Sequence, residues 1–175
     1  MISQTQMNAH EMLALWQQQY PTYTVAQLYG RHVFEGLLAI KNCAGITVFN
    51  GINEEGTQAF VLIGTNPQGF LFIDDPIFDM GSFPFPPDTN TFAGFLQPPA
   101  MSGKEISRET AAVMINKWQE EQPEDLHATL VSRAEVEVLL MISDCAGIMI
   151  CNALDEEGHY TLVLLPVDAT GAVMA

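Results

Sequence analysis

The chain has 175 residues, 48% of them hydrophobic, and its 21 acidic residues against 6 basic ones give a net charge of -15. Binding to nucleic-acid phosphates or to an anionic membrane surface needs clustered lysine and arginine, and no such cluster is present. No apolar run approaches the roughly 20 residues that cross a bilayer, so neither nucleic acid nor a membrane is an expected partner.

The first 73 residues predict an order of helix, strand, helix, strand, strand. Asn8-x-x-Glu11 is a capping box that opens the first helix, and Pro21 closes it. Residues 25–29 form a short strand candidate, followed by the second helix. Residues 46–52 and 59–63 form a hairpin around an Asn-Glu-Glu-Gly turn.

Residues 74–102 read as a connecting segment rich in proline and phenylalanine. Proline excludes helix and central strand, so we expect irregular backbone. The phenylalanines make the segment too apolar for a free tether. We expect an ordered strap packed on the flanking units, the alternative being a loop that presents phenylalanine and proline to a partner.

Residues 103–175 repeat the first unit without a gap. Residues 37–46 recur as residues 139–148, an offset of 102 (139 minus 37), and the same offset pairs Trp16 with Trp118. Because tryptophan and cysteine are rare and both match, chance does not explain the repeat. The chain is therefore predicted to be an α+β protein of two tandem pseudo-symmetric units, 1–73 and 103–175, joined by the segment 74–102.

The second unit adds detail to this prediction. Ser132-x-x-Glu135 is a capping box for its second helix, which is expected to turn four side chains toward a core: Val136, Leu139, Leu140 and Met141. Gly45 and Gly147 are expected to stop the helices before them and start the next strands. The hairpin strands of this unit are apolar on both faces, which is typical of strands covered on both sides.

A unit of about 70 residues has little core of its own. Two units docked around a pseudo-twofold axis would bury the remaining apolar faces. We therefore interpret the chain as a fused version of an ancestral homodimer, and expect a monomer with internal pseudo-twofold symmetry.

The N-terminus lacks the basic and apolar regions of a secretory signal. The three cysteines, Cys43, Cys145 and Cys151, include no Cys-x-x-Cys pair and fit a reducing compartment better than a disulfide framework. We expect a cytoplasmic protein. Since no histidine lies at ligand spacing and none recurs in the repeat, neither a metal nor another cofactor is predicted.

The chain contains no catalytic motif, so an enzyme is not favoured. Arg31 and Arg133 occupy matched positions, each four residues before a matched glutamate. They are interpreted either as helix pairs or as two arginines that converge near the pseudo-axis to hold an anion. Tyr20 and Tyr23 are expected on an uncharged surface of the first unit that either the connecting segment or a partner covers, and together with Phe83 and Phe85 they form a candidate partner surface.

The stretch from Cys145 to Gly171, with Ile77-Phe78-Asp79 and Pro84-Phe85-Pro86-Pro87, resembles an uncharacterised protein family of Bacteroidetes bacteria. In that family a similar hairpin is followed by a Gly/Asp-rich turn and a Pro-rich tail. The cysteines that often flank those prolines are absent here. The resemblance implies no function, because none is assigned to that group.

Three functions remain open from the sequence. The first is a non-enzymatic protein-interaction or adaptor module. The second is a small-molecule binder, or an unrecognised enzyme, that uses the cleft between the repeats. The third is an acidic inhibitory or immunity-like protein whose second unit covers a basic target, since net charges of -2, -4 and -9 fall on residues 1–73, 74–102 and 103–175.

Overall fold

The structure is a computed structural model that describes residues 9–20, 26–79, 103–124 and 128–174. The first half contributes α1 (Ala9–Gln19), β1 (Ala26–Gly30), α2 (Arg31–Leu38), β2 (Gly45–Ile52), β3 (Gln58–Thr65) and β4 (Ile77–Asp79). The second half contributes β5 (Lys104–Ile106), α3 (Arg108–Glu121), β6 (Ala128–Ser132), α4 (Arg133–Leu140), β7 (Gly147–Leu154) and β8 (Tyr160–Val167). The α+β fold is confirmed, and the predicted order of five elements is present in both halves.

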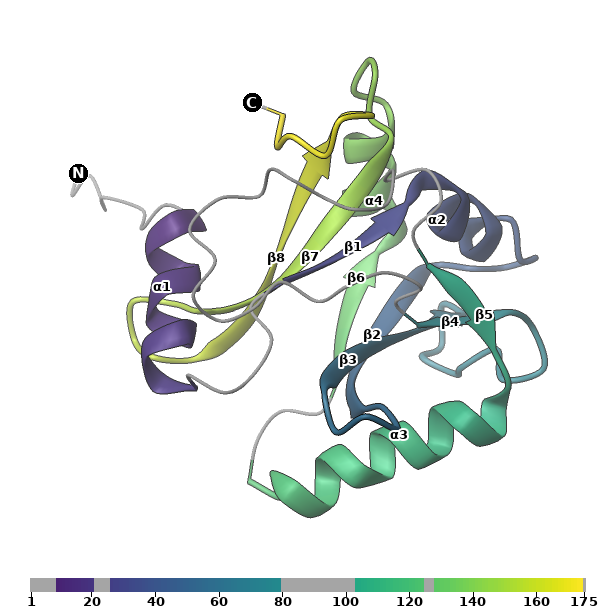
Figure 1. Cartoon of the computed structure of the whole chain (residues 1–175). Helices are drawn as coiled ribbons and strands as arrows, with labels where there is room; N and C mark the ends of the chain where they lie inside the picture. Colours follow the sequence, from purple (N-terminus) through teal and green to yellow (C-terminus); the bar gives the residue numbers. More distant parts are fainter. Residues whose placement is uncertain (1–8, 21–25, 80–102, 125–127, 175) are drawn as a thin grey trace.

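The two halves exchange their first strands. One antiparallel sheet has the order β1-β7-β8, and the other has the order β5-β4-β3-β2-β6. The strand β1 therefore pairs with the hairpin of the second half, while β6 pairs with the hairpin of the first half (Figure 1). Neither sheet is built from one half alone.

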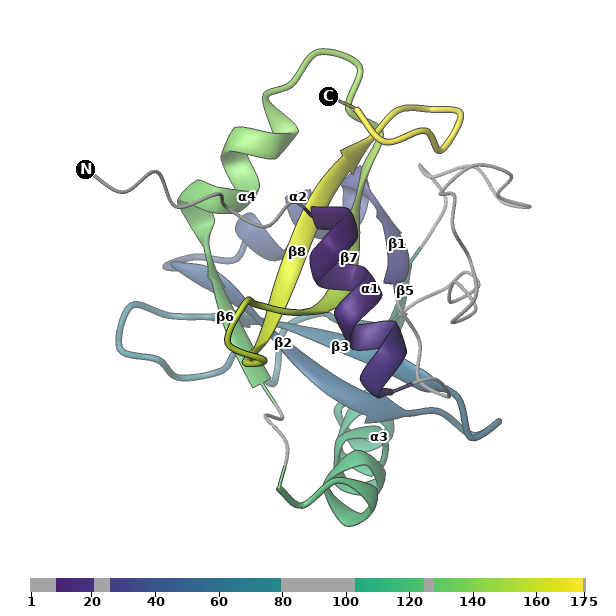
Figure 2. The ribbon, with the colours of Figure 1, turned by 90° about the vertical axis from the view of Figure 1, so that its left-hand side faces the viewer.

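The first helix of each half follows the same exchange. The helix α1 packs against β7, and α3 packs against β2. Figure 2 shows α1 lying across the sheet that contains β7 and β8, with α3 beneath the other sheet. Each hairpin is thus covered on one face by a helix from the opposite half, which explains why β7 is buried along its whole length.

Between the sheets lies the largest core cluster, to which α2 and α4 both contribute. A second cluster brings repeat-equivalent residues into one place: Trp16 with Trp118, and Ile52 with Leu154. Equivalent residues can meet only near the axis that relates the halves, so the tryptophans mark that axis. The prediction that Met141 turns toward a core is wrong, because the side chain lies past the end of α4 and is 82% exposed.

Gly45 and Gly147 do not stop the preceding helices, as the sequence had suggested. The helices end several residues earlier, and the left-handed positions are taken by Asn42 and Asp144, both at φ 67°. A Cβ atom at Gly147 would lie 2.5 Å from the Tyr29 carbonyl oxygen, and one at Gly45 would lie 2.5 Å from that of Val131. Glycine is needed here because the exchanged strand passes too close for any side chain.

The predicted hairpin turns are confirmed. Asn53 Oδ1 accepts backbone hydrogen bonds from Glu55 and Thr57, and Asp155 plays the same part in the second hairpin. Gly56 and Gly158 hold the left-handed positions at φ 81° and 82°. The acidic residues of these turns therefore need no bound cation to explain them.

The prediction that 74–102 holds no strand is wrong at its start. Residues Ile77–Asp79 form β4, which pairs with β3 on one side and with β5 on the other. Pro76 stands just before the strand, where its missing N–H costs no ladder bond. The rest of the strap that the sequence predicts, residues 80–102, lies outside the described parts of the chain. None of the described helices has the length and apolar content needed to span a bilayer.

Candidate functional site

In the first half, side chains from β1 close the edge of β3. The Gln27 side-chain amide donates to the Gln58 carbonyl at 2.9 Å and accepts from the Phe60 N–H at 3.0 Å. The Tyr29 hydroxyl has two acceptors within reach of its single hydrogen, the Gln27 side-chain oxygen at 3.0 Å and the Phe60 carbonyl at 3.2 Å. Burial, and to a smaller extent the charge of Asp79, raises the pKa of Tyr29, so its hydroxyl remains a donor. We call this contact the first seam.

The rest of the β3 edge is also engaged. Backbone groups of alternate strand residues point to the same edge, so the outward positions after Phe60 are Leu62 and Gly64. Leu62 pairs with Phe78 of β4, and the Gly64 carbonyl accepts from the Phe72 N–H at 2.9 Å. All eight residues of β3 are buried as a result.

The equivalent contact in the second half, here called the second seam, lacks these groups. Thr129 and Val131 stand where Gln27 and Tyr29 stand in the first half. The Thr129 hydroxyl is buried and has no hydrogen-bond partner within the described part of the chain. A threonine side chain is too short to bridge two strand edges as a glutamine does. The side chains that close the first seam therefore have no counterpart here.

No strand in the described ranges pairs with the outer side of β8. The Pro166 carbonyl accepts from the Met174 N–H, which places outward backbone groups at Leu162 and Leu164 as well. The six residues from Tyr160 to Leu165 are only partly buried, whereas their counterparts in β3 are fully buried. We call the outward side of Leu162 and Leu164 the β8 edge, and it is our candidate functional site.

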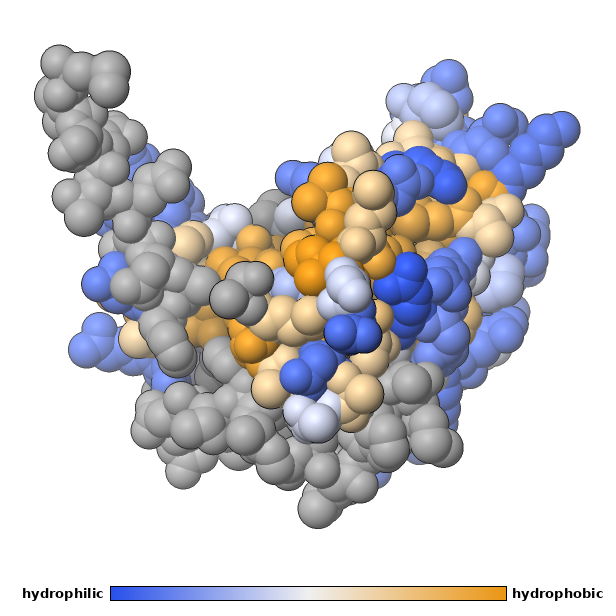
Figure 3. All heavy atoms as spheres, turned by 90° about the horizontal axis from the view of Figure 1, so that it is seen from above, coloured by the Kyte–Doolittle hydropathy of each residue, from blue (hydrophilic) through white to orange (hydrophobic). Residues whose placement is uncertain are grey.

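The helix α4, beside the β8 edge, also exposes an apolar side chain. In the first half, the Phe78 ring lies 3.7 Å from the place of a Cβ atom on Gly36 of α2. The repeat-equivalent residue of α4 is Val138, which is 64% exposed. Figure 3 shows apolar residues reaching the surface over a continuous area of the upper face of the molecule. Contiguous apolar surface of this kind is typical of sites that bind a protein or another ligand.

The charge around the second hairpin is negative. Its turn carries Asp155, Glu156 and Glu157, and Glu135 of α4 stands at the position that buried Val33 occupies in α2. Backbone hydrogen bonds, first of all from His159, lower the pKa of Asp155, so this carboxylate stays ionised near neutral pH. The β8 edge is thus an apolar strand edge in an acidic setting.

The structure does not bring the Arg31 and Arg133 side chains together. Arg31 Nη1 donates to the Leu140 and Cys145 carbonyls at the end of α4, and Arg133 Nη1 donates to the Leu38 and Cys43 carbonyls at the end of α2. Since each arginine begins the helix whose far end the other one contacts, about 10 Å of helix separates them. Each also pairs with the glutamate four residues on, Glu35 or Glu137.

These arginines join the two halves, so we expect Arg31→Ala to lower the free energy of unfolding by about 1–2 kcal/mol. The variant loses two charge-assisted hydrogen bonds to carbonyls of the opposite half, at 2.7 Å and 3.2 Å. Arg108→Ala is the matched control, because its ion pair with Asp74 is highly exposed, and we expect a loss below about 0.5 kcal/mol. Urea unfolding of both variants measures the difference, and equal losses would contradict the cross-half role.

Of the candidate partner surface, only Tyr20 lies within the described ranges. Its ring packs on Trp16, with centroids 4.3 Å apart, and it is partly buried at the cluster that marks the pseudo-axis. Tyr23, Phe83 and Phe85 lie outside the described residues. The structure therefore places one of the four, and Tyr160 at the start of β8 packs on the same Trp16 ring, with centroids 5.4 Å apart.

The cysteines and histidines form no site where the structure describes them. Cys43 and Cys145 are buried and donate to the Gly45 and Gly147 carbonyls, and burial raises the pKa of the Cys151 thiol. A thiol with a raised pKa is a poor nucleophile. Within the described residues, no group of three or more side chains could hold a metal ion.

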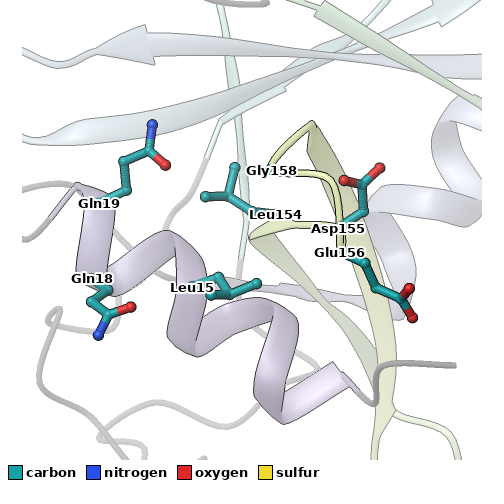
Figure 4. Close-up of a pocket in the computed structure, with 7 residues that line it drawn as sticks. All are labelled: Leu15, Gln18, Gln19, Leu154, Asp155, Glu156 and Gly158. Carbon is teal, nitrogen blue, oxygen red and sulfur yellow. The ribbon is translucent and has the colours of Figure 1, made fainter. Parts of the chain in front are cut away.

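One cavity, which reaches Leu154 of the tryptophan cluster, is shallow. It measures about 260 Å³ and lies between the end of α1 and the turn of the second hairpin; its lining residues are Leu15, Gln18, Gln19, Leu154, Asp155, Glu156 and Gly158. Figure 4 shows the two leucines between helix and hairpin, while the carboxylates point away from them. Small-molecule sites need polar groups that converge, so this geometry gives the second alternative little support.

Asp79 at the end of β4 is half-buried, and burial raises its pKa to about 6, with Lys104 acting in the opposite direction. The folded state therefore holds this proton more tightly than the unfolded chain. The protonated group favours the folded state below about pH 4, and this stability is lost as the pH rises through about 6. We expect Asp79→Asn to be more stable than the wild type at pH 8, by about 1 kcal/mol after discounting for solvent screening, and equal at pH 4.

Urea titrations at pH 4, 6 and 8 check this expectation. Asp155→Asn provides a control of opposite sign, because the pKa of Asp155 is lowered in the folded state and the variant loses stability at neutral pH. A constant difference between Asp79→Asn and the wild type at all three pH values would contradict the assignment.

Comparison with known proteins identifies no relative: no family model matches the chain, and neither a curated protein nor a solved structure does. The resemblance to the Bacteroidetes family therefore stays a prediction. The β8 edge itself was missed by the sequence reasoning. Two features of the sequence could have indicated it. Thr129 and Val131 replace Gln27 and Tyr29 at matched positions, and the uncharged strand of the second hairpin carries Pro166 near its end.

Proposed function

We propose that this chain is a non-enzymatic protein-interaction module that binds an extended segment of a partner protein along the β8 edge. One observation carries the proposal. The strands β3 and β8 occupy repeat-equivalent places, yet the outer edge of β3 is completed by Gln27, Tyr29 and β4, while β8 has no strand paired on its outer side in the described residues.

Addition of a strand to an open edge is a common mode of peptide recognition, since main-chain hydrogen bonds give affinity and side-chain positions give specificity. The β8 edge offers both kinds of contact. Pro166 limits the pairing to the first part of the strand, because it has no N–H to donate outward. A bounded edge of this kind resists unlimited self-association while it leaves a short segment available.

The test compares two substitutions at one outward position. Leu164→Pro removes the outward N–H, as Pro166 does two residues later, whereas Leu164→Ala keeps the N–H and shortens the side chain. Tagged wild type and both variants are purified gently from the native host and analysed by native mass spectrometry. We expect a co-purifying protein with the wild type and with Leu164→Ala, and at least a tenfold smaller amount with Leu164→Pro.

Equal capture by all three proteins would contradict the proposed edge. A small added mass with no protein would favour the small-molecule alternative. The acidic inhibitory alternative is favoured by the charge of the second half, and it predicts a complex that dissociates as salt is raised. A complex that survives high salt argues against that version.

A further inference from the structure

The proposed function names an edge but not the sequence that binds there. The first half contains a strand already seated on the equivalent edge, and it serves as an internal template. On β3, Ile77 lies opposite Ile63, Phe78 opposite Leu62 and Asp79 opposite Val61. The repeat-equivalent positions on β8 are Leu165, Leu164 and Val163. A partner strand in the same register would therefore run antiparallel to β8 and place three consecutive residues opposite these positions.

The central residue of that strand meets a smaller space than Phe78 does. The Phe78 ring packs over Gly36, where even an added Cβ atom would lie at an ordinary contact distance of 3.7 Å. In the second half Val138 brings two methyl groups beyond its Cβ into this region. A phenylalanine in the same pose would meet them, because packed interiors leave little free volume. An aliphatic side chain such as leucine fits the reduced space.

The residue in the place of Asp79 meets a charge that the first half lacks. The Asp79 backbone carbonyl in the first half lies near Gly103, and Gly103 packs against Val33 and Tyr29, which are both uncharged. The second half has Glu135 and Val131 at the positions of Val33 and Tyr29. Glu135 adds a negative charge to this region, which favours a partner lysine or arginine over an aspartate.

Resting on the proposed function, we infer that the β8 edge is a vacant copy of the β4 seat and takes an extended partner segment of the pattern apolar, aliphatic, basic. The partner is another protein whose exposed strand carries this pattern antiparallel to β8. Its basic residue complements the acidic second half, whose 13 acidic residues outnumber its 4 basic ones. The template strand Ile-Phe-Asp, by contrast, fits its own seat and not this one.

A tethered strand tests the inference without a known partner. Residues Ala172–Met174 follow β8 as residues 70–72 follow β3, with the same bridge and hydrogen bond. The sequence Asp-Asp-Pro-Ile-Leu-Lys is added after Ala175, so that Ile-Leu-Lys stands at the repeat-equivalent place of Ile77–Asp79. A matched extension, Asp-Asp-Pro-Ile-Phe-Asp, copies residues 74–79 unchanged.

We expect the Ile-Leu-Lys extension to slow hydrogen exchange of the Leu164 amide, the counterpart of Leu62 opposite Phe78, at least tenfold and to raise the Tm by about 2–4 °C. The factor by which the Ile-Phe-Asp extension slows exchange should be at least threefold smaller. No protection with either extension would overturn the seat. Equal protection by both extensions, or stronger protection by Ile-Phe-Asp, would overturn the deduced pattern. A wild-type dimer held through β8 in native mass spectrometry would overturn the choice of partner in favour of a second copy.

The outcomes separate this inference from the proposed function. If the extension docks but the wild type captures no host protein, the seat stands and the proposed function fails. If a host protein is captured and lost with Leu164→Pro but no extension docks, the proposed function stands and the template inference fails.

Discussion

Cut between residues 90 and 91, neither half of the chain is expected to fold as a monomer. Each half would retain a hairpin but lose the first strand and first helix that cover it, because these come from the other half. A two-stranded hairpin with an uncovered apolar face is at best marginally stable in water. The tandem arrangement thus predicts a complete loss of the cooperative unfolding transition in the separate halves.

Circular dichroism and urea unfolding of the two purified halves, alone and mixed in equal amounts, measure this result. We expect the mixture to regain a cooperative transition, since the exchanged elements can assemble from two chains. The full chain cleaved at the same place is the control for the cut itself. A stable monomeric half would contradict both the exchange and the interpretation as a fused homodimer. A half that folds only at high concentration as a homodimer would support that interpretation.

The local elements were predictable because their signals are local. The capping box at Ser132 is present in the structure, with both of its reciprocal hydrogen bonds. The Asx residues at 53 and 155 open their turns, and the helices α1 and α3 end at Gln19 and Glu121, each two positions before a proline in the sequence. Each of these features depends on side chains within four residues of one another.

The exchange of strands was not predictable from the same signals. In a repeat, a strand that pairs within its own copy and one that pairs with the other copy have the same apolar pattern. The distinguishing residue was Gly147, which has no Cβ atom. A Cβ there would lie only 2.5 Å from the carbonyl oxygen of Tyr29 in the opposite half. From the sequence alone we interpreted that glycine as a helix stop, because glycine is common both at helix C-termini and where another backbone passes close by.

The strand β4 was missed because proline dominated the composition of its segment. Three of the described residues after Pro76 form the strand, and their partners lie in β3 and β5, far apart in the chain. The candidate site depends on the same strand, since β4 shows what a completed edge looks like. Without β4 as a comparison, the partial burial of β8 would be that of any ordinary edge strand.

The second large effect on stability is expected at the first seam. We expect Gln27→Leu to lower the free energy of unfolding by about 3 kcal/mol, because the Phe60 N–H and the Gln58 carbonyl would lose their Gln27 partner inside the protein. The Tyr29 hydroxyl would be left with the Phe60 carbonyl as its acceptor. Leucine is close to glutamine in volume, so a cavity adds little to this loss.

The control for this prediction is the repeat-equivalent position in the second half. Thr129→Val removes a buried hydroxyl that has no partner among the described residues, so we expect no loss and a gain of up to about 1 kcal/mol. Urea unfolding of the two variants should thus give effects of opposite sign at matched positions. If both variants lost similar stability, the glutamine would contribute only packing. The difference between the closed edge of β3 and the open edge of β8 would then rest on β4 and not on Gln27.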